Sequence, residues 1–523
     1  MRALRLPLLL ALVVGACAAG APARRDIVIG LVGEPPTVLA DHPSARVLAA
    51  AVTETLVRRD ATDEFTPRLA AEVPTLANGG LRVAYDDPDA PGGRLVATFR
   101  IRPEARWHDG RPVTGADVRF AWEEDRRAPE GSEARLVAER VDRLEVLSDR
   151  TVRFSYRANE RWDGYPLAAR AMPSHLLAGA SDAARAAYSR DPVHAGPFSV
   201  AAWLPGFGVT LAAFPEYVLG RPGLGRIEVR FFTGRPALLD ALSRGEVDVV
   251  PSPALEADLG RALDRLSEGS QRTRLQTYYT AAEATETLWF GERFGDLRLR
   301  QAVERGIDRQ AITGAVFAGR ARVPRSYLVP PLWAAADLGG PPPLDREGAR
   351  ALLAAAGYRA GSFGILERGG ERLVLTILVA EGSPGRTDSA RVVAGQLAAV
   401  GIAADVREVA GAELEVLLQG GSFDLAVLPE RAGDPLFATL RQSRRAGPWF
   451  DVLAAAARTS PDQADRRALY AELQRLYVEA LPSLPLYQYL AVDVAPRALS
   501  GVRPTPHLAP LTWNAHEWRF VAP

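Results

Sequence analysis

The feature that most constrains the fold is an alternation of apolar strands and helices in the second half of the chain. The expected order is strand, helix, strand, helix, strand, over Leu373 to Ala380, Asp388 to Val400, Ile402 to Val409, Ala412 to Gln419 and Phe423 to Leu428. Gly401 stands where a helix gives way to the next strand, a position that favours glycine. Such a series predicts a parallel sheet with right-handed crossovers.

A shorter unit of the same kind lies well over a hundred residues earlier. It consists of the strand Ile227 to Phe232, a helix from Pro236 to Arg244 and the strand Val247 to Val250. The hydrophobic core of a single domain stops growing at about 250 to 300 residues, so a chain of 523 residues is expected to form several domains. Because open parallel sheets bind ligands at the carboxyl ends of their strands, we expect an α/β protein with a ligand cleft between two lobes.

Other segments have simpler local signals. Turn-rich residues 86–93 separate Leu81 to Tyr85 from Arg94 to Ile101, a pattern that predicts a hairpin. Apolar residues recur at helical spacing within Leu299 to Ala318, which predicts one helix there. Another helix is expected from Pro461 to Leu481, and Pro330 to Pro343 is too rich in proline and glycine for regular structure.

The segment RWHDGRPVTGADVRFAW, Arg106 to Trp122, contains a well-specified helix start. Thr114 is a good N-cap, and Asp117 stands three residues later, where a capping-box acid belongs. Asp109 precedes a glycine in the turn before the helix. On these grounds His108 and Asp109 are interpreted as turn residues and not as catalysts.

Composition excludes several function classes. The chain has no lysine, so all 63 basic residues are arginine, which excludes a P-loop and Schiff-base chemistry. The six histidines are scattered, with no HExxH zinc motif. The 63 acids balance the 63 bases, so no basic excess favours nucleic acid. We therefore expect neither catalytic residues, nor a metal, nor a cofactor.

The amino end has the layout of an export signal. Two arginines within the first five residues precede the apolar run Leu6 to Val14, and two small residues separate that run from Cys17, the only cysteine. The sequence VGAC resembles a bacterial lipobox, in which the cysteine is lipidated and begins the mature protein. The alternative is an ordinary signal peptide with a chance cysteine. The lipobox implies a signal peptide at 1–16 and a lipid-anchored linker at 17–24.

Many segments resemble, in order, the bacterial extracellular solute-binding proteins of family 5, the lipid-anchored or periplasmic receptors of peptide and nickel ABC importers. The most specific is FRIRPEARWHDGRPVTGADVRFAW, Phe99 to Trp122. The others are GEPPTVLADHP (33–43), FTPRLAAEVP (65–74), HAGPFSVAAWLPGFGVTL (194–211), LSRGEVDVV (242–250), LRLRQAVERGIDRQAI (297–312), ARALLAAAGY (349–358) and YAELQRLYVEALPSLPLY (470–487). The resemblance covers nearly the whole mature chain.

The resemblance implies a periplasmic-binding-protein fold of class II, cluster C type. It places lobe I in residues 25–51, 192–276 and 491–523, an extra domain inserted in lobe I at 52–191, and lobe II, the third domain, at 277–490. Closure of the two lobes would be a hinge motion in which ligand selects the closed form.

The function implied is a receptor that captures a peptide-like ligand and delivers it to an ABC permease with its ATPase subunits. Such a receptor is exported, held on the outer face of the cytoplasmic membrane or in the periplasm by the lipid at Cys17, and is expected to be a monomer. The alternatives are the same fold with a metal chelate, a sugar or an anionic peptide as ligand, and, from another class, an exported lipoprotein hydrolase.

The candidate ligand residues lie first in LPERAGDPLF, Leu428 to Phe437. In peptide-binding relatives an aspartate shortly before an Asp-Pro receives the peptide's ammonium group. Here Asp434 matches that Asp-Pro, and the alignment then puts Arg431 where the acid would be, so that an anion or carboxylate would be the better partner. Two alternatives are that Glu430 serves as the acid, or that Arg431 is a solvated loop charge.

Four further residues are weaker candidates. Tyr278 and Tyr279 stand where the chain enters the third domain and could cover a ligand, although cores use tyrosine as often. Arg386 is expected in a loop at the carboxyl end of the sheet, where it could hold a carboxylate or be a surface charge. Glu34 lies in the turn that the family uses near its pocket.

Overall fold

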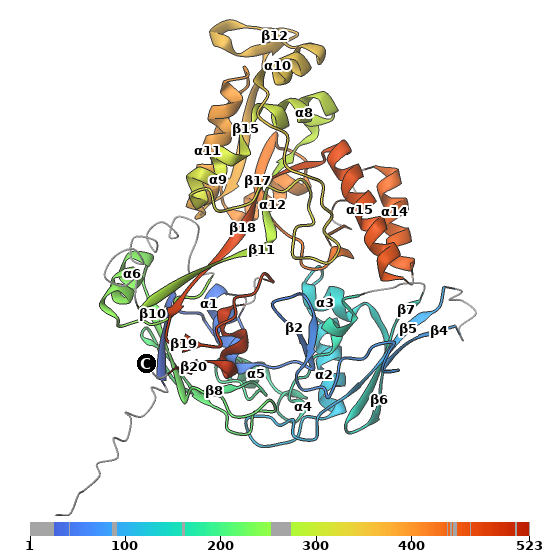
Figure 1. The fold of residues 1–523 in the computed structure, drawn as a ribbon, viewed down its shortest axis with the longest axis vertical. Coiled ribbons are helices and arrows are strands. Elements are labelled where there is room, and N and C mark those ends of the chain that lie inside the picture. The colour runs from blue at the N-terminus through green and yellow to red at the C-terminus, as the bar shows by residue number, and fades with distance from the viewer. Residues whose placement is uncertain are drawn as a thin grey trace, which may run out of the picture.

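Two lobes and an inserted domain make up the protein, as Figure 1 shows for the computed structural model. The structure describes residues 26–40, 42–85, 92–158, 163–252, 274–436, 438–439, 442, 447–460, 462–507 and 510–521. The predicted signal peptide, Cys17 and the linker lie outside these residues. Among the described residues no helix is both long enough and apolar enough to cross a bilayer.

Lobe I is built on a four-stranded sheet in the order β1 (Asp26–Val32), β10 (Arg226–Phe232), β9 (Gly208–Ala213) and β8 (Phe198–Leu204). β1 runs parallel to β10, and Val249 bridges to Ile29 on the other side of β1. Of the predicted strand, helix, strand unit, the first strand and the helix are present, whereas Val247 to Val250 forms no strand and contributes only isolated bridges, from Val249 to Ile29 and from Val250 to Val494. Its helix, α6 (Arg235–Arg244), ends at Gly245, which has the left-handed φ of 77° that glycine tolerates.

The two faces of this sheet are covered by different helices. Alternate side chains of β1 point to opposite faces. Ile27, Ile29 and Leu31 pack with α1 (Pro43–Val52) and η4 (Leu511–Glu517), whereas Val28 and Val32 pack with α6. The C-terminal segment therefore completes the core of lobe I.

Lobe II contains the long predicted series. Its sheet has the order β16 (Ala403–Val409), β15 (Val374–Ala380), β17 (Leu425–Arg431), β11 (Leu275–Phe290) and β18 (Ser483–Pro496). β15 pairs in parallel with both β16 and β17, as expected, and β11 pairs antiparallel with β17 on one side and with β18 on the other. The crossover helices α11 (Pro384–Ala398) and α12 (Gly411–Gln419) pack on opposite faces of the sheet.

β17 differs from the prediction, because it begins at Leu425 and continues to Arg431 instead of ending at Leu428. Pro429 favoured an earlier end, since proline cannot donate to a strand ladder. Beyond Ala426, however, β17 has no ladder partner on the side of β15, and it remains paired with β11 as far as Arg431. Tertiary pairing thus carries Glu430 and Arg431 on a strand and not in a loop.

The single helix predicted from Leu299 to Ala318 is wrong, since the chain forms α8 (Leu297–Gly306) and α9 (Arg309–Phe317). Ile307 is extended, and the Asp308 carboxylate accepts the backbone N–H of Ala311 at 3.0 Å as the N-cap of α9. The apolar face continues across the break, so periodicity alone could not reveal it. The other predicted helix is present as α15 (Gln463–Ala480), and residues 330–343 have no helix or strand.

The inserted domain has an antiparallel sheet in the order β4 (Leu81–Ala84), β5 (Arg94–Arg100), β7 (Thr151–Ala158) and β6 (Val141–Ser148). The predicted hairpin is β4 with β5. Asp117 of α2 (Gly115–Arg126) accepts from the backbone N–H and hydroxyl of Thr114, so the predicted capping pair is confirmed. The same carboxylate accepts the indole N–H of Trp107 and the N–H and hydroxyl of Ser174.

Shorter elements complete the described residues. The strands are β2 (Val57–Arg59), β3 (Phe65–Pro67), β12 (Arg359–Ala360), β13 (Leu366–Arg368), β14 (Glu371–Arg372), β19 (Leu499–Ser500) and β20 (Arg519–Phe520). The helices are α3 (Glu133–Ala138), α4 (Ser174–Leu177), α5 (Asp182–Arg190), α10 (Arg346–Ala355), α14 (Pro448–Thr459), η1 (Tyr165–Ala168), η2 (Glu292–Phe294) and η3 (Ser362–Gly364).

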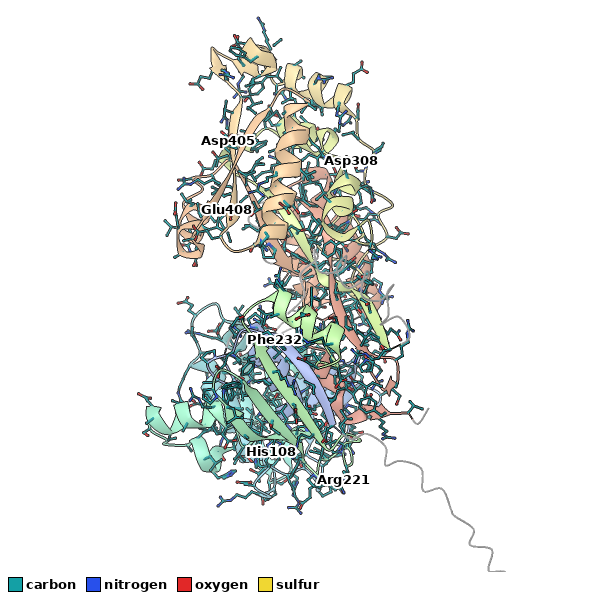
Figure 2. The ribbon with its side chains drawn as sticks, turned by 90° about the vertical axis from the view of Figure 1, so that its left-hand side faces the viewer. His108, Arg221, Phe232, Asp308, Asp405 and Glu408 are labelled. Atoms are coloured by element: carbon teal, nitrogen blue, oxygen red, sulfur yellow. The ribbon has the colours of Figure 1, made fainter. Side chains whose placement is uncertain are left out.

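β11 and β18 are the long strands that connect the lobes, and they run as a diagonal pair between the lower and upper parts of Figures 1 and 2. Their register runs from Leu275 opposite Pro496 to Trp289 opposite Ser483, with an irregularity between Ala281 and Thr285. At the lower end Val494 of β18 also exchanges backbone hydrogen bonds with Val250 of lobe I. The lobe boundaries expected at 276/277 and 490/491 therefore fall inside continuous strands.

Asp493 gives the connecting strands a pH dependence. Burial raises the pKa of this carboxyl to about 7, with one hydrogen bond from the Ser252 N–H at 2.7 Å opposing the shift. The unfolded chain loses this proton near the ordinary value of 3.8. Between these values the folded state binds the extra proton, so stability falls as the pH rises, by up to roughly 1.4 kcal/mol per pH unit.

We expect Asp493→Asn to remove this dependence, because the amide is neutral and can still accept from Ser252. Urea denaturation at pH 5 and at pH 7.5 measures the free energy of unfolding of both proteins. The wild type should lose more stability than the variant over this interval. Parallel losses in the two proteins would show that Asp493 does not titrate in this range.

Candidate functional site

A cavity of about 1000 Å³ lies where the end of β17 faces the inserted domain. Segments from both lobes and from the inserted domain contribute to its wall. The lining residues are Thr55, Val57, Arg58, Arg59, Asp125, Gly131, Glu133, Ala134, Leu136, Val137, Leu167, Ala169, Arg170, Glu283, Trp289, Leu428 to Asp434, and His507. A volume of this size fits the range of about 300 to 1,000 Å³ usual for small-ligand sites.

On the lobe II side, the last residues of β17 divide between the interior and the cavity. Successive side chains of a strand point to opposite faces. Glu430 is buried, with 6% of its surface exposed, and accepts a hydrogen bond from the amide of Gln442. Burial, followed by the charge of Glu430, raises the pKa of the Tyr477 hydroxyl. Arg431 is exposed on the cavity wall.

Two arginines of the cavity wall are engaged by neighbouring groups of the protein. Arg170 contacts Asp125 at 2.9 Å, and burial raises the pKa of that aspartate against the opposing effect of the arginine. Arg58 pairs with Glu54 at 3.2 Å and also donates to the carbonyls of Thr53 and Trp513. Arg58 thus donates to several protein groups, whereas the Arg170 guanidinium contacts Asp125 through Nη1 and remains 40% exposed.

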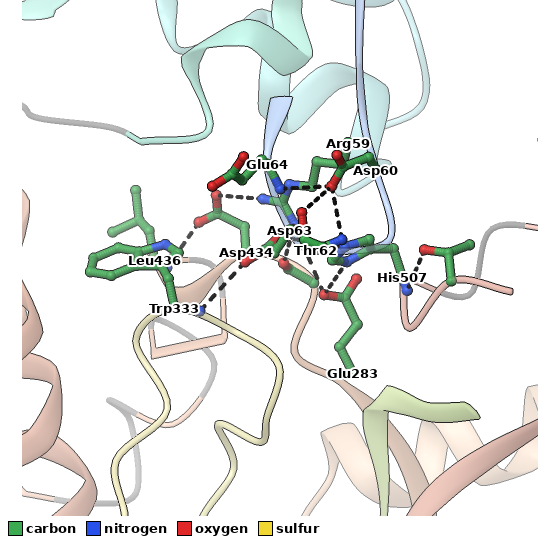
Figure 3. A network of polar contacts seen from close by, with 12 residues as sticks. Arg59, Asp60, Thr62, Asp63, Glu64, Glu283, Trp333, Asp434, Leu436 and His507 are labelled. Atoms are coloured by element: carbon green, nitrogen blue, oxygen red, sulfur yellow. Dashed lines mark hydrogen bonds and ion pairs between the residues drawn. The ribbon is translucent and has the colours of Figure 1, made fainter. Parts of the chain in front are cut away.

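Four charged or titratable residues of the cavity wall, together with Asp63 behind them, form what we call the Arg59 cluster: Arg59, Asp63, Glu283, Asp434 and His507 (Figure 3). The Arg59 guanidinium lies 3.4 Å from Asp63, 3.8 Å from Asp434 and 3.9 Å from Glu283. Its Nη1 donates to the Gly433 carbonyl at 2.8 Å. The His507 Nδ1 lies 3.0 Å from Glu283 Oε2. Burial raises the pKa of Glu283, while His507 and Arg59 oppose the shift.

The cluster joins segments from all parts of the chain. Arg59 comes from β2 and Asp63 from the loop after it, while Glu283 lies at the irregularity of β11. The Glu283 N–H donates to Pro506, and its carbonyl accepts from Ala432. The two lobes and the inserted domain thus meet at this point through backbone as well as side-chain contacts.

Leu436 connects the segment after β17 to the inserted domain through an apolar contact. It lies just after β17, yet it packs into the core of the inserted domain, with 5% of its surface exposed. Its N–H donates to the Asp434 carboxylate at 2.9 Å. Nearby, Arg466 of α15 pairs with Asp163 of the inserted domain, with Nε 3.0 Å from Oδ2.

The structure brings two of the candidate ligand residues, Arg431 and Asp434, into this cavity, together with the alternative Glu430. Arg431 is exposed there, Glu430 is turned into the lobe, and Asp434 caps the following turn while facing Arg59. The other four candidates are not among the described residues that line the cavity.

Arg386 lies at the start of α11 and does hold a carboxylate, but that carboxylate belongs to Glu286 of β11. Its Nε is 2.9 Å from Glu286 Oε1, and the Glu286 side chain is 1% exposed. The Tyr489 hydroxyl also donates to Glu286. Arg386 therefore neutralises a buried acid in the centre of the sheet.

The three remaining candidates lie away from the cavity. Tyr278 packs at the edge of the lobe I core, and Tyr279 lies under the Arg320 guanidinium, 4.9 Å from the ring centre. Glu34 accepts from the Trp203 indole N–H at 2.6 Å and from the Gly206 N–H at 2.8 Å. Glu34 thus holds loops of lobe I, whereas the two tyrosines belong to the connecting strand β11.

Sequence reasoning missed Arg59, Glu283 and His507. Arg59 lies just before the segment 65–74 quoted for the resemblance, and no local pattern distinguishes the other two. They stand 224 residues apart in the chain, so their contact depends wholly on the tertiary fold.

Comparison with known proteins agrees with this architecture. A family model described as bacterial extracellular solute-binding proteins, family 5 Middle, matches residues 64–437. The chain belongs to this family. The predicted family and the two-lobed α/β fold with a ligand cleft are thereby confirmed. Family 5 is a family of binding proteins, in keeping with the expectation that the chain is not an enzyme.

Individual relatives can be aligned with most of this family 5 chain. It is 27% identical over 494 residues to Protein XP55 of Streptomyces lividans, covering 90% of this chain and 84% of that protein. It is 25% identical over 484 residues to di/tripeptide-binding protein 2 of Pseudomonas aeruginosa, covering 84% and 86%. The crystal structure of NikA from Brucella suis with Fe(III)-EDTA superposes with a TM-score of 0.79 at 18% identity, over 95% of this chain and 100% of that one.

Replacing Arg386 by methionine tests its structural role. The change would leave the buried Glu286 carboxylate without its guanidinium, so we expect a loss of about 3 to 5 kcal/mol in the free energy of unfolding. Adding Glu286→Gln should recover most of this loss, because the buried charge is then removed. Denaturant titration of the three proteins measures these differences. Unchanged stability in the single variant would return Arg386 to the candidate ligand residues.

Proposed function

We propose that this family 5 protein captures a short, peptide-like ligand with a carboxylate or other anionic group in the cavity at the end of β17. The observation that carries the proposal is the exposed Arg431 on the cavity wall. A guanidinium pairs well with a carboxylate and repels an ammonium group. The name of the Pseudomonas relative, a di/tripeptide-binding protein, supports a short peptide.

The size of the cavity supports a small ligand. About 1000 Å³ is at the upper end of the range for sites that enclose small molecules. The apolar side chains of Leu136, Val137 and Leu167 could cover ligand side chains, while strand-like main-chain bonds to the end of β17 would hold a peptide backbone. This mode gives affinity with little demand on side-chain identity.

A non-peptide anionic ligand, such as a metal chelate, is the second candidate. The similarity in fold to NikA crystallised with Fe(III)-EDTA supports it, because that ligand is a polycarboxylate chelate. Carboxylates of a chelate would pair with Arg431 as well as a peptide carboxylate does. The two candidates therefore share the arginine and differ in what fills the rest of the cavity.

In the cell, the receptor would release its ligand to an ABC permease powered by ATPase subunits. We assign lobe I to residues 25–51, 192–276 and 491–523, the inserted domain to 52–191 and lobe II to 277–490. Movement of lobe II about β11 and β18 would open and close the cavity. The receptor would act as an exported monomer, held by a lipid on Cys17, and would carry out no chemical step.

A ligand screen with a charge-reversal variant tests the proposal. Ligand that binds only the folded state raises its stability, by about 2.7 kcal/mol at a hundredfold excess over Kd. We expect di- and tripeptides or carboxylate chelates to raise the melting temperature of the protein lacking residues 1–17. Arg431→Asp should shift the preference from anionic toward cationic ligands.

The matched control is Arg359→Asp, which reverses the charge of an exposed arginine. Arg359 lies on β12 at the far tip of lobe II, away from the cavity (Figure 1). It should leave the ligand preference unchanged. An equal effect of both variants, or no stabilisation by any anionic ligand, would refute the role of Arg431.

Lipidation at Cys17 is tested separately. A cysteine thioether to diacylglycerol, together with a second acyl chain, gives stable membrane attachment. In bacteria grown with labelled fatty acid, the wild-type protein should carry label and sediment with membranes, whereas Cys17→Ala should do neither. Label retained in the variant would contradict the anchor.

A further inference from the structure

Two acceptor atoms face each other inside the Arg59 cluster. The His507 Nδ1 lies 3.0 Å from Glu283 Oε2. With Glu283 ionised, this contact requires a hydrogen on Nδ1, because a carboxylate only accepts. The lone pair of Nε2 is then directed to the other side of the ring, where Asp63 Oδ1 lies 3.7 Å away. Two acceptors at this separation repel each other unless a proton or a metal cation lies between them.

Both atoms are buried without a hydrogen-bond partner. The side chains of His507 and Asp63 are only 8% and 5% exposed, and neither Nε2 nor Oδ1 makes a hydrogen bond among the described residues. Besides its contact with His507, Asp63 Oδ1 forms an ion pair with the Arg59 guanidinium at 3.4 Å. Buried polar atoms are normally satisfied, and unsatisfied ones mark a strained or ligand-binding position.

The charges of the cluster point the same way. One guanidinium, Arg59, faces the three carboxylates of Asp63, Glu283 and Asp434. The cluster therefore brings together more carboxylates than guanidinium groups. A divalent cation would offset this excess, and the low dielectric of a buried site makes the compensation strong.

We propose that Asp63 Oδ1 and His507 Nε2 bind a first-row divalent transition metal such as Zn²⁺ or Ni²⁺. Imidazole nitrogen with carboxylate oxygen is a donor set that these metals prefer, whereas Mg²⁺ and Ca²⁺ favour oxygen alone. Glu283 is the positioning residue, because it holds the Nδ1–H and orients the ring toward the metal. One ligand atom from each of the three residues lies within 4.8 Å of the others.

A metal at this site would connect three segments that are distant in the sequence. Asp63 follows β2, and His507 comes from the C-terminal segment, while Glu283 belongs to the strand that joins the lobes. A metal would tie these segments together on the wall of the cavity and leave coordination positions for water or a bound anion. This inference stands apart from the identity of the transported ligand.

Calorimetric titration of metal-stripped protein tests the site without any transported ligand. Residual metal is removed with a chelating resin, since a soluble chelator could itself enter the cavity. We expect Zn²⁺ and Ni²⁺ each to bind with a stoichiometry of one, and Mg²⁺ not to compete. His507→Gln and Asp63→Asn should each weaken binding at least tenfold, and Glu283→Gln should also weaken it.

His175→Gln is the matched control. His175 also contacts an aspartate, Asp109, at 2.7 Å, but this pair lies outside the cavity and does not belong to the Arg59 cluster. Its metal affinity should equal that of the wild type. Circular dichroism shows that each variant is folded.

Nitrogen NMR of the His507 ring provides a readout independent of affinity, assigned by the signals lost in His507→Gln. At neutral pH we expect the Nδ1–H tautomer, with an Nε2 shift on addition of Zn²⁺. A doubly protonated ring that does not respond to metal would overturn the proposal, since a proton would then lie between the two acceptors. Zn²⁺ binding equally strong in His507→Gln and Asp63→Asn would also overturn it.

Discussion

The pairing of β11 with β18 is the constraint on which the rest of the structure depends. These strands belong to the sheet of lobe II and also reach lobe I, where Val494 bonds to Val250. Their register fixes how far apart the lobes lie and where the irregularity after Ala281 falls. Glu283 stands at that irregularity and lines the cavity, so the local break in strand pairing coincides with the Arg59 cluster.

Arginine supplies the ionic contacts of this framework, in a chain without lysine. A planar guanidinium with five donors can hold a carboxylate and backbone carbonyls at the same time. Arg58 does so at the base of the inserted domain, Arg386 in the sheet of lobe II and Arg59 where the parts meet. Each fixes an acid that would be costly to bury alone. Arg431 is an exposed arginine of the cavity wall.

Much of the fold could be predicted because its signals are local. The β15 to β17 series was predicted from apolar runs and helical spacing, and Gly401 adopts the φ of 92° expected where a helix ends. The predictions were wrong where contacts with distant segments determine the secondary structure, or where a break leaves the apolar periodicity unchanged. β17 continues through Pro429 because β11 still pairs with it, and the helix break at Ile307 preserves the apolar periodicity. Of the candidate site, Arg431 and Asp434 line the cavity, whereas Arg386 is held by a buried acid that no sequence pattern announces.

The sequence by itself determined much of the order of strands and helices through short-range periodicity, and the absence of lysine-dependent chemistry through composition. The family followed from the resemblance of its ordered motifs. Only the tertiary structure decided that Arg59, Glu283 and His507 meet, and that Arg431 instead of Glu430 is exposed to the cavity. The physical reason is that burial and charge compensation depend on distances in space. Residues 224 positions apart carry no local trace of the contact they make.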